Sequence, residues 1–216
     1  MKDIAIFGAG GFGKEVACLI DRIKKAESEP KWNLKGFFDD GKKIGSQISY
    51  YGEVLGGIEE LNSWHDPISI VIAIGNPITI MSVRKRIKGS HIDFPNLIDP
   101  TFMIADERGF KIGNGNIIQG NCCASCDTEI GDFNVFNGDV AMGHDVIIGN
   151  YNVIMPDIRI SGEVTIGNCN LLGVGSIVLQ QIKVGNNVHL GAGAVLMTKP
   201  KDGNTYIGNP AKLFKY

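Results

Sequence analysis

The residues of this chain best suited to acid–base chemistry are a histidine and an aspartate that are adjacent in the sequence, His144 and Asp145. A neutral imidazole, whose ordinary pKa is about 6.5, can remove a proton at physiological pH. A carboxylate beside it can fix the tautomer and stabilise the imidazolium that forms. Adjacent residues on a strand point to opposite faces. The pair can therefore meet only at a corner of the chain or through a neighbouring subunit.

Cysteine and metal chemistry are alternatives at the same place. Cys126 lies 18 residues before His144, so a Cys–His acyl-enzyme is conceivable. We expect direct transfer instead, because cysteine recurs nearby at positions 122, 123 and 169 as filler. A zinc enzyme such as a carbonic anhydrase would need three histidine ligands, and a lone C-x-x-C is weak evidence for zinc. We expect no metal, because no spacing joins His144 to the other histidines, which are His65, His91 and His189.

A glycine-rich turn near the N-terminus is the second feature with chemical meaning. Gly8, Gly10 and Gly13 complete a GxGxxG pattern between an apolar run at residues 4–7 and a helix predicted from Phe12. Such a turn presents the backbone N–H groups of a helix N-terminus to a phosphate. We therefore expect a nucleotide or nucleotide-sugar site here.

Three further strands are predicted at residues 34–38, 69–74 and 94–98. Because strands and helices alternate, the sheet should be parallel, and polar residues after its strands should share one edge with the glycine turn. These edge residues are Asp39, Asp40, Gly75 and Asn76.

A dinucleotide-dependent oxidoreductase is the competing interpretation of the glycine turn. We rank it lower, because only one of the two halves of a dinucleotide fold precedes the break at Asp99-Pro100. The predicted domains are residues 1–100, a Rossmann-like α/β half-domain that binds a nucleotide sugar, and residues 101–216, a β-helix with a C-terminal tail.

The second half of the chain has a strict period of 18 residues. The phrases IGNGN, IGDFN, IGNYN, IGNCN and VGNNV begin at positions 112, 130, 148, 166 and 184, and an apolar residue returns every six positions from Ile112 to Leu196. Neither a helix nor simple alternation predicts this spacing, whereas stacked turns of three strands do. We predict a triangular parallel β-helix, with the apolar residue facing the axis and the glycine beside it at a corner with positive φ.

This period fixes which residues lie above one another. Asn116, Asn134, Asn152 and Asn170 should stack about 4.8 Å apart as an amide ladder. Gly162 should lie one turn above His144, so we expect open space over the imidazole for a substrate.

Composition excludes several classes of partner. The net charge of −2 and the isoelectric point near 6.1 give no reason to expect nucleic acid or an anionic membrane. No apolar run approaches the ~20 residues that span a bilayer, and the N-terminus lacks a signal-peptide layout. Five unevenly spaced cysteines suit a reducing compartment. We expect a cytoplasmic protein.

These motifs together resemble one family. The six-residue period is similar to the hexapeptide signature of left-handed β-helix acyltransferases. The whole chain resembles their branch with an added nucleotide-sugar domain, namely bacterial sialic-acid O-acetyltransferases and UDP-4-amino-sugar N-acetyltransferases of the bacillosamine pathway. The segments that carry the resemblance are GAGGFGKE (8–15), FFDD (37–40), AIGN (73–76), NGDVAMGHD (137–145), SGEVTIG (161–167), LGAGAV (190–195) and GNPAK (208–212).

The resemblance implies a homotrimer that binds acetyl-CoA between neighbouring β-helices, with His144 as general base and Asp145 as its partner. It implies cofactor contacts at Gly162, Gly173, Ala192 and Lys212. It implies substrate contacts at Gly8, Gly11, Phe12, Asp39, Asp40, Gly75, Asn76 and Asn137, the last of these to the acceptor sugar.

Two positions depart from the family pattern. Val153 stands where many relatives have a second histidine that helps to bind acetyl-CoA, and Phe12 stands where some amino-sugar enzymes have histidine. The first expected acceptor is the amine of a UDP-linked 4-amino-4,6-dideoxy sugar, in surface-polysaccharide biosynthesis. The alternatives are a hydroxyl of sialic acid or another sugar, and a non-catalytic nucleotide-sugar sensor, which would have no use for His144.

Overall fold

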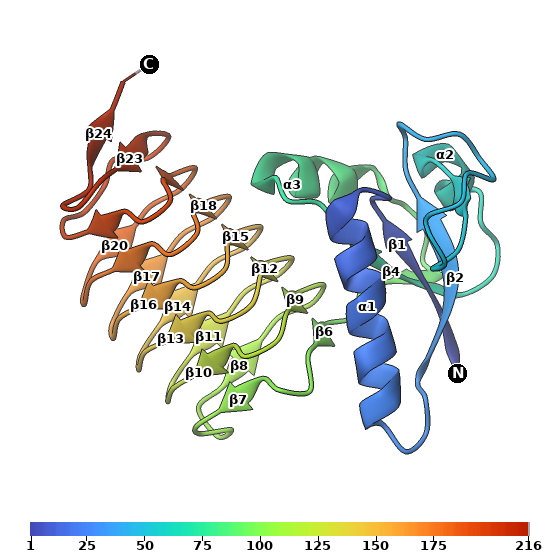
Figure 1. Ribbon diagram of the computed structural model, residues 1–216, viewed down its shortest axis with the longest axis horizontal. Helices are drawn as coiled ribbons and strands as arrows, with labels where there is room; N and C mark the ends of the chain where they lie inside the picture. Colours follow the sequence, from blue (N-terminus) through green and yellow to red (C-terminus); the bar gives the residue numbers. More distant parts are fainter. Residues whose placement is uncertain (216) are drawn as a thin grey trace.

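The computed structural model describes residues 1–215 as an α/β domain followed by a long parallel β-helix (Figure 1). The predicted fold class is confirmed. The α/β domain contains β1 (Lys2–Phe7), α1 (Gly11–Ala26), β2 (Trp32–Phe38), β3 (Val54–Gly56), α2 (Ile58–Asn62), β4 (Ile68–Ile72), α3 (Pro77–Arg86) and β5 (Ile92–Asp93).

The sheet of this domain is parallel and has the order β3-β2-β1-β4-β5. Its central strands match the predicted ones, but the strand predicted at residues 94–98 is wrong. Strand β5 takes the edge of the sheet instead, and the chain leaves it at Phe94. Leu97–Ile98 forms β6, which pairs with β9 in the β-helix. Pro95, which has no N–H to donate, lies at this change of sheet.

The β-helix consists of three sheets whose strands have two residues each and run parallel, except that the two strands at its end have three residues and the last of these is antiparallel. The docked face, which lies against the α/β domain, contains β6 (Leu97–Ile98), β9 (Ile117–Ile118), β12 (Val135–Phe136), β15 (Val153–Ile154), β18 (Leu171–Leu172), β21 (His189–Leu190), β23 (Thr205–Ile207) and the antiparallel β24 (Lys212–Phe214). The second face contains β7 (Met103–Ile104), β10 (Cys123–Ala124), β13 (Ala141–Met142), β16 (Arg159–Ile160), β19 (Ile177–Val178) and β22 (Val195–Leu196). The third face contains β8 (Lys111–Ile112), β11 (Glu129–Ile130), β14 (Ile147–Ile148), β17 (Thr165–Ile166) and β20 (Lys183–Val184).

The periodic apolar residue is the second residue of every strand from β8 to β22 and faces the axis, as predicted. The corner prediction was wrong in detail. Positive φ does not occur at the glycine after this residue but two positions further on, at every sixth residue from Gly115 to Gly193. Glycines such as Gly149 are needed for another reason, because a Cβ there would lie 2.6 Å from the carbonyl oxygen of Gly167 in the next turn.

Two ladders of side-chain amides run along the β-helix. In the buried ladder, Asn152 donates its backbone N–H and its Nδ2 to Asn134 Oδ1 and accepts from both nitrogens of Asn170. Asn152 also donates to the carbonyl oxygen of Gly167 at 2.9 Å. The exposed ladder runs through Asn168, whose Oδ1 accepts from the backbone of Asn150. The predicted amide ladder is confirmed.

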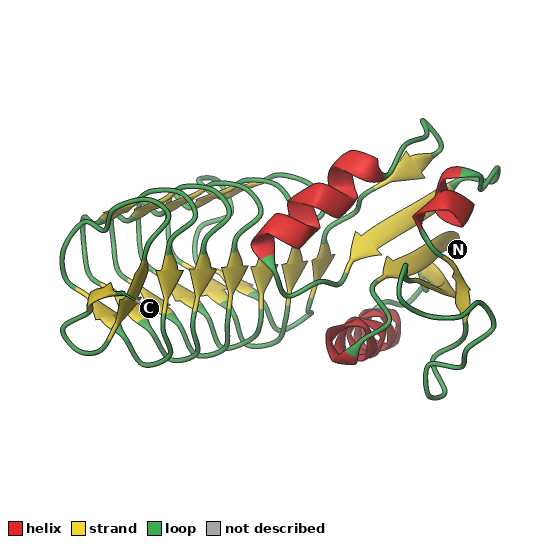
Figure 2. Cartoon of the chain, turned by 90° about the horizontal axis from the view of Figure 1, so that it is seen from above, coloured by secondary structure: helices red, strands yellow, loops and turns green. Residues whose placement is uncertain are grey.

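The α/β domain packs on the docked face, and α3 reaches over the β-helix (Figures 1 and 2). Val135 and Val153 belong to the same apolar cluster as the core of the α/β domain. The ring of Phe133 stacks on Tyr151 with centroids 5.5 Å apart, and the Arg84 guanidinium lies 5.5 Å from the Phe133 centroid. These contacts fix one domain on the other. No helix among residues 1–215 has the length and hydropathy that a membrane span requires.

The two ladders allow a matched test of the buried amides. Asn152→Ala would leave two N–H groups of Asn170 and the carbonyl oxygen of Gly167, all in the next turn, without their partner, whereas Asn134 Oδ1 would keep the backbone N–H of residue 152. Since each buried unpaired group costs about 1–3 kcal/mol, the free energy of unfolding should fall by at least about 3 kcal/mol. Asn168→Ala, on the exposed ladder, should lower it by about 1 kcal/mol or less. Urea denaturation measures both, and equal losses would contradict the structural role of the buried ladder.

Candidate active site

The glycine turn lies at the carboxyl edge of the parallel sheet, between the ends of β1 and β4. Gly8 has φ of +115°, and a Cβ on Gly13 would collide with the Gly8 carbonyl oxygen, so the turn packs tightly under α1. A Cβ on Gly10, Gly11 or Gly75 would instead meet no atom within 4 Å. These three glycines leave an open surface beside the N-terminus of α1, where a phosphate can approach the backbone N–H groups.

The acidic pair after β2 lies at the same edge but is bonded to the backbone. Asp39 Oδ2 accepts from the N–H of Ala9 at 2.8 Å and therefore holds the glycine turn in place. Asp40 Oδ1 accepts from the N–H of Ile58, and its Oδ2 lies 3.0 Å from Arg86 Nη1. A cavity of about 450 Å³ opens beside both carboxylates. Asn76 caps α3 through its Oδ1, which accepts from the N–H of Thr79 at 3.0 Å.

His144 and Asp145 meet at a corner of the β-helix, between β13 and β14. Asp145 has φ of +57°, and this left-handed conformation lets its side chain turn toward that of its neighbour. His144 Nδ1 lies 2.7 Å from Asp145 Oδ2. Both side chains are about half exposed, at 48% and 58%. With Nδ1–H donating to the carboxylate, Nε2 carries the free lone pair.

The space over Gly162 is filled by the imidazole itself, so the expected open space above the ring is wrong. A Cβ on Gly162 would collide with His144 Nε2 and lie 2.6 Å from its Cε1. A Cβ on Gly143 would lie 2.7 Å from the backbone nitrogen of Gly162. Within residues 1–215 the Gly162 N–H has no hydrogen-bond partner. Sequence reasoning missed Gly143, although its place beside the histidine was a signal.

The other predicted site residues fall on two edges of the prism. The base edge, between the second and third faces, carries Cys126, His144 and Gly162 in successive turns. The acceptor edge, between the docked and second faces, carries Asn137 and, two turns further on, Gly173. A Cβ on Gly173 would lie 2.6 Å from the backbone nitrogen of Ala192 in the next turn.

Lys212 lies beyond both edges, in the exposed strand β24. One chain therefore keeps the predicted cofactor contacts apart.

The structure also places three further residues named in the sequence analysis. Val153 has no exposed surface and packs under the α/β domain, so no ligand can contact this side chain. Cys126 Sγ accepts weakly from Ser125 Oγ at 3.9 Å, and no bond joins it to His144 among the described residues. Phe12 is half-buried against the core of the α/β domain.

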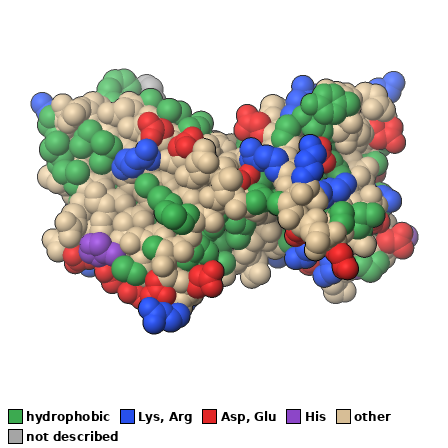
Figure 3. Space-filling model, turned by 60° about the horizontal axis from the view of Figure 1, so that its bottom comes forward, with side chains coloured by type: hydrophobic (Ala, Val, Ile, Leu, Met, Phe, Trp, Pro, Cys, Tyr) green, Lys and Arg blue, Asp and Glu red, His purple; other side chains and the backbone are tan. Residues whose placement is uncertain are grey.

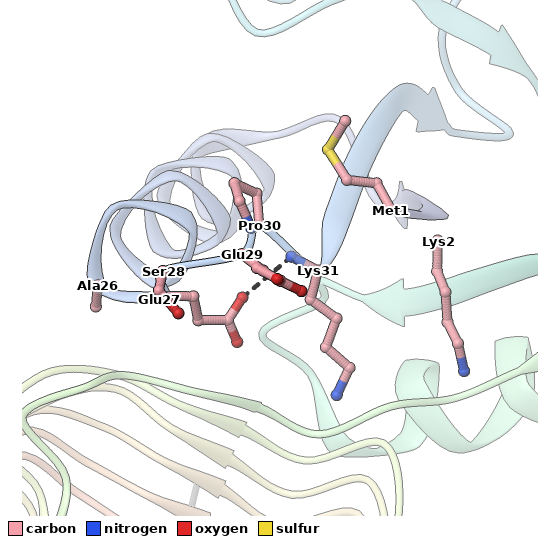
Figure 4. A pocket seen from close by; sticks show the side chains of 8 residues that line it. All are labelled: Met1, Lys2, Ala26, Glu27, Ser28, Glu29, Pro30 and Lys31. Atoms are coloured by element: carbon pink, nitrogen blue, oxygen red, sulfur yellow. Dashed lines mark hydrogen bonds between the residues drawn. The ribbon is translucent and has the colours of Figure 1, made fainter.

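A second hollow of the α/β domain is lined by no predicted site residue. It has a volume of about 780 Å³ and lies at the opposite end of the sheet, where the Lys31 N–H donates to Glu27 Oε2 (Figure 4). No group of three His, Cys, Asp or Glu residues within positions 1–215 could hold a metal ion.

The sequence of the α/β domain matches a known family model. Residues 3–87 match the model described as the PglD N-terminal domain. The search among curated proteins gave no match.

The whole chain matches solved acetyltransferases. It is 28% identical to the acetyltransferase domain of PglB from Neisseria gonorrhoeae in complex with acetyl coenzyme A, covering 99% of each chain with a TM-score of 0.85. It is 25% identical to WeeI from Acinetobacter baumannii, covering 99% of this chain and 100% of that one with a TM-score of 0.86.

A third solved structure is less similar in sequence and shows only that the fold is the same. A histidine-to-asparagine variant of perosamine N-acetyltransferase from Caulobacter crescentus, in complex with CoA and GDP-perosamine, is 20% identical over 100% and 98% of the chains, with a TM-score of 0.82. The resemblance to hexapeptide-repeat sugar acetyltransferases drawn from the sequence is confirmed.

Substitutions of Gly143 and Gly162 test whether the His144 ring can move away from a side chain placed against it. Gly143→Ala places its Cβ against backbone of the next turn, which cannot move, and should lower the free energy of unfolding by about 1–3 kcal/mol. Gly162→Ala meets only the end of a half-exposed side chain and should change it by about 0.5 kcal/mol or less. Urea denaturation compares them, and equal destabilisation would mean that the His144 ring is locked in place.

Proposed function

We propose that the chain is an acetyl-CoA-dependent N-acetyltransferase whose acceptor is the amine of a nucleotide-linked amino sugar. The observation that carries the proposal is the contact of 2.7 Å between His144 Nδ1 and Asp145 Oδ2 at a half-exposed corner. It occurs in a fold shared along its whole length with an acetyltransferase domain bound to acetyl coenzyme A. Because Asp145 fixes one ring nitrogen, the other is free to act as general base.

The transfer would be direct. Nε2 of His144 takes a proton from the sugar amine as the amine nitrogen attacks the thioester carbonyl, and a C–N bond forms. The Gly162 N–H, which has no partner in the described residues, would donate to the carbonyl oxygen as it gains negative charge. The C–S bond then breaks, and the imidazolium returns the proton to the departing CoA sulfur. Asp145 stabilises the imidazolium between these steps.

The acceptor class follows from the N-terminal domain. The three open glycines at the α1 N-terminus suit a phosphate, and the carboxyl edge of a parallel sheet is where nucleotides bind. A nucleotide anchor would recruit a sugar that carries the amine. A sialic acid bound as the free sugar would not need such an anchor, so its hydroxyls are the second candidate acceptor.

We propose that the enzyme is a homotrimer. The base edge and the acceptor edge of one chain are separated by the second face, so a neighbouring copy must bring one edge to the other. The β-helix half shows broad uncharged and hydrophobic surface, with a row of charged side chains along its lower rim in this view (Figure 3). Large apolar side chains exposed on the β-helix include Met103, Ile147, Val174, Leu179 and Met197. Such a surface favours self-association.

Release of free thiol from acetyl-CoA tests the reaction. With a panel of UDP-linked 4-amino-4,6-dideoxy sugars and sialic acids, we expect release with an amino sugar. His144→Ala should lower kcat by at least about 100-fold, because general-base catalysis contributes ~10²–10⁴-fold.

The matched control is His189→Ala, since His189 is a partly buried histidine on the docked face, and it should retain wild-type kcat. Cys126→Ser should also retain it. A near-normal kcat for His144→Ala would remove the base from the mechanism, and loss of activity in Cys126→Ser would revive the covalent route.

Mixed subunits test the shared site. If each site takes His144 from one chain and Asn137 from the next, inactive His144→Ala and Asn137→Ala proteins unfolded and refolded together should regain activity. Random assembly predicts about a quarter of the wild-type sites. Recovery is read by thiol release, with each variant refolded alone as the control. No recovery in mixtures whose mass is that of a trimer would place both residues in one chain's site.

A further inference from the structure

A glutamate and two glutamines form a hydrogen-bonded group in the turns directly above His144. Glu163 Oε1 accepts from Gln180 Nε2 at 3.1 Å, and Glu163 Oε2 accepts from Gln181 Nε2 at 3.1 Å. Because an ionised carboxylate only accepts hydrogen bonds, each amide must present its nitrogen to Glu163 and turn its oxygen away. Within residues 1–215 the oxygen Oε1 of Gln180 has no hydrogen-bond partner. Gln180 therefore carries a free acceptor whose direction is set by Glu163.

The register of the β-helix places this free acceptor beside the base. Strands β13, β16 and β19 pair in successive turns, so His144, Gly162 and Gln180 occupy the same position of the repeat. The His144 ring leans toward the turn of Gly162, where a Cβ would lie 2.6 Å from Cε1 of the ring. Gln180 reaches back to the same turn, since its amide bonds to Glu163, the residue after Gly162. The imidazole and the amide thus approach Gly162 from opposite sides.

The missing side chain at Gly162 leaves a gap between these two groups. The backbones of His144 and Gln180 are two turns apart, which is about 10 Å for stacked strands. Because each side chain reaches toward the turn between them, their polar ends lie closer together than the backbones. A single ligand atom at about 2.9 Å from each polar end would bridge such a gap.

Two hydrogen-bond acceptors face the gap. Nε2 of His144 carries a lone pair when Nδ1–H donates to Asp145 Oδ2, 2.7 Å away, and the nitrogen of the Gln180 amide is occupied by Glu163. A nucleophile bonded to both acceptors must supply two hydrogens and keep a lone pair for the thioester carbonyl. A neutral amine, with two N–H bonds and one lone pair, meets this requirement. A hydroxyl supplies one hydrogen and would turn a lone pair against the second acceptor.

The charge at this edge also favours an amine. Asp145 and Glu163 occupy the same left-handed corner position in successive turns, about 4.8 Å apart. Neither carboxylate is paired with a lysine or an arginine within residues 1–215. A sugar amine that arrives as an ammonium ion is attracted to these carboxylates, whereas an uncharged hydroxyl is not. The ammonium loses one proton to solvent before Nε2 of His144 takes a second proton during the attack.

We propose that Gln180 determines the choice between amine and hydroxyl acceptors. Its Oε1 accepts the hydrogen of the attacking amine that His144 does not take, and Glu163 is the positioning residue that orients the amide. This hydrogen remains on the nitrogen and becomes the N–H of the acetamido product. The inference rests on the proposed function, because it specifies which group of the acceptor reacts at the same base.

The test compares, by calorimetry, the binding of two UDP-linked sugars that differ only in carrying an amine or a hydroxyl at C4. Gln180→Met keeps the length of the side chain and removes the oxygen. We expect the ratio of the two affinities, amine over hydroxyl, to fall by about tenfold, with the affinity for acetyl-CoA unchanged. The kcat for the amino sugar should also fall by about tenfold.

The matched control is Gln181→Met, which removes the other bond to Glu163 but no acceptor beside His144. It should leave the affinity ratio unchanged. Both glutamines are exposed, so neither substitution should unfold the protein.

An unchanged ratio in Gln180→Met would overturn the inference, as would an equal fall in Gln181→Met or a wild-type protein that binds both sugars equally. The proposed function fails by a separate result, the absence of thiol release from the wild-type protein with every acceptor. Thiol release with the amino sugar, combined with a wild-type kcat in Gln180→Met, would remove Gln180 from the site and leave the acetyltransferase in place.

Discussion

The pairing of each residue with the one 18 positions further on is the constraint on which this structure depends. The buried asparagines enforce it, because each one bonds the backbone and side-chain nitrogens of the next asparagine in the ladder. An insertion of one residue in any turn would break this ladder and move apolar side chains off the axis. The position of a residue within the 18-residue repeat therefore sets the place of its side chain on the surface of the β-helix.

The same regular spacing of residues along the β-helix also positions the α/β domain. Corner residues in the left-handed conformation repeat every six positions, and on one edge they include Phe133 and Tyr151, which stack as a short aromatic column. Arg84 of α3 lies over Phe133, and Arg22 of α1 pairs with Asp99 at the start of the β-helix. The two helices thus contact different edges of the β-helix. These two contacts leave a cavity beside α1. They also hold the α/β domain over Val153, which is therefore buried between the domains and not available to a cofactor.

The sequence predicts the elements that follow a strict period and misses what depends on how corners are shaped. The 18-residue step places Gly162 over His144 correctly. It cannot show that the ring turns upward into that space, because the direction depends on the left-handed backbone at Asp145. Periodicity also predicts an inward face at Ile154 but carries no information about what covers Val153. The hydrogen bond from Arg22 Nη2 to Gln119 Oε1 also depends on tertiary structure, since the two residues lie in different domains and 97 positions apart in the chain.

Under the proposed mechanism, the exposure of His144 means that a single chain would be an incomplete catalyst. His144 is 48% exposed at an edge of the β-helix. An imidazole in open water gains little from its position, because catalysis by proximity requires the acceptor and the thioester to be held against it. Electrostatic help from a backbone N–H is also weak unless water is excluded. The β-helix is a straight prism, so its faces do not fold over the edge that carries His144. The proposed mechanism therefore needs a second wall from outside the chain, which the acceptor edge of another copy would supply in the proposed trimer.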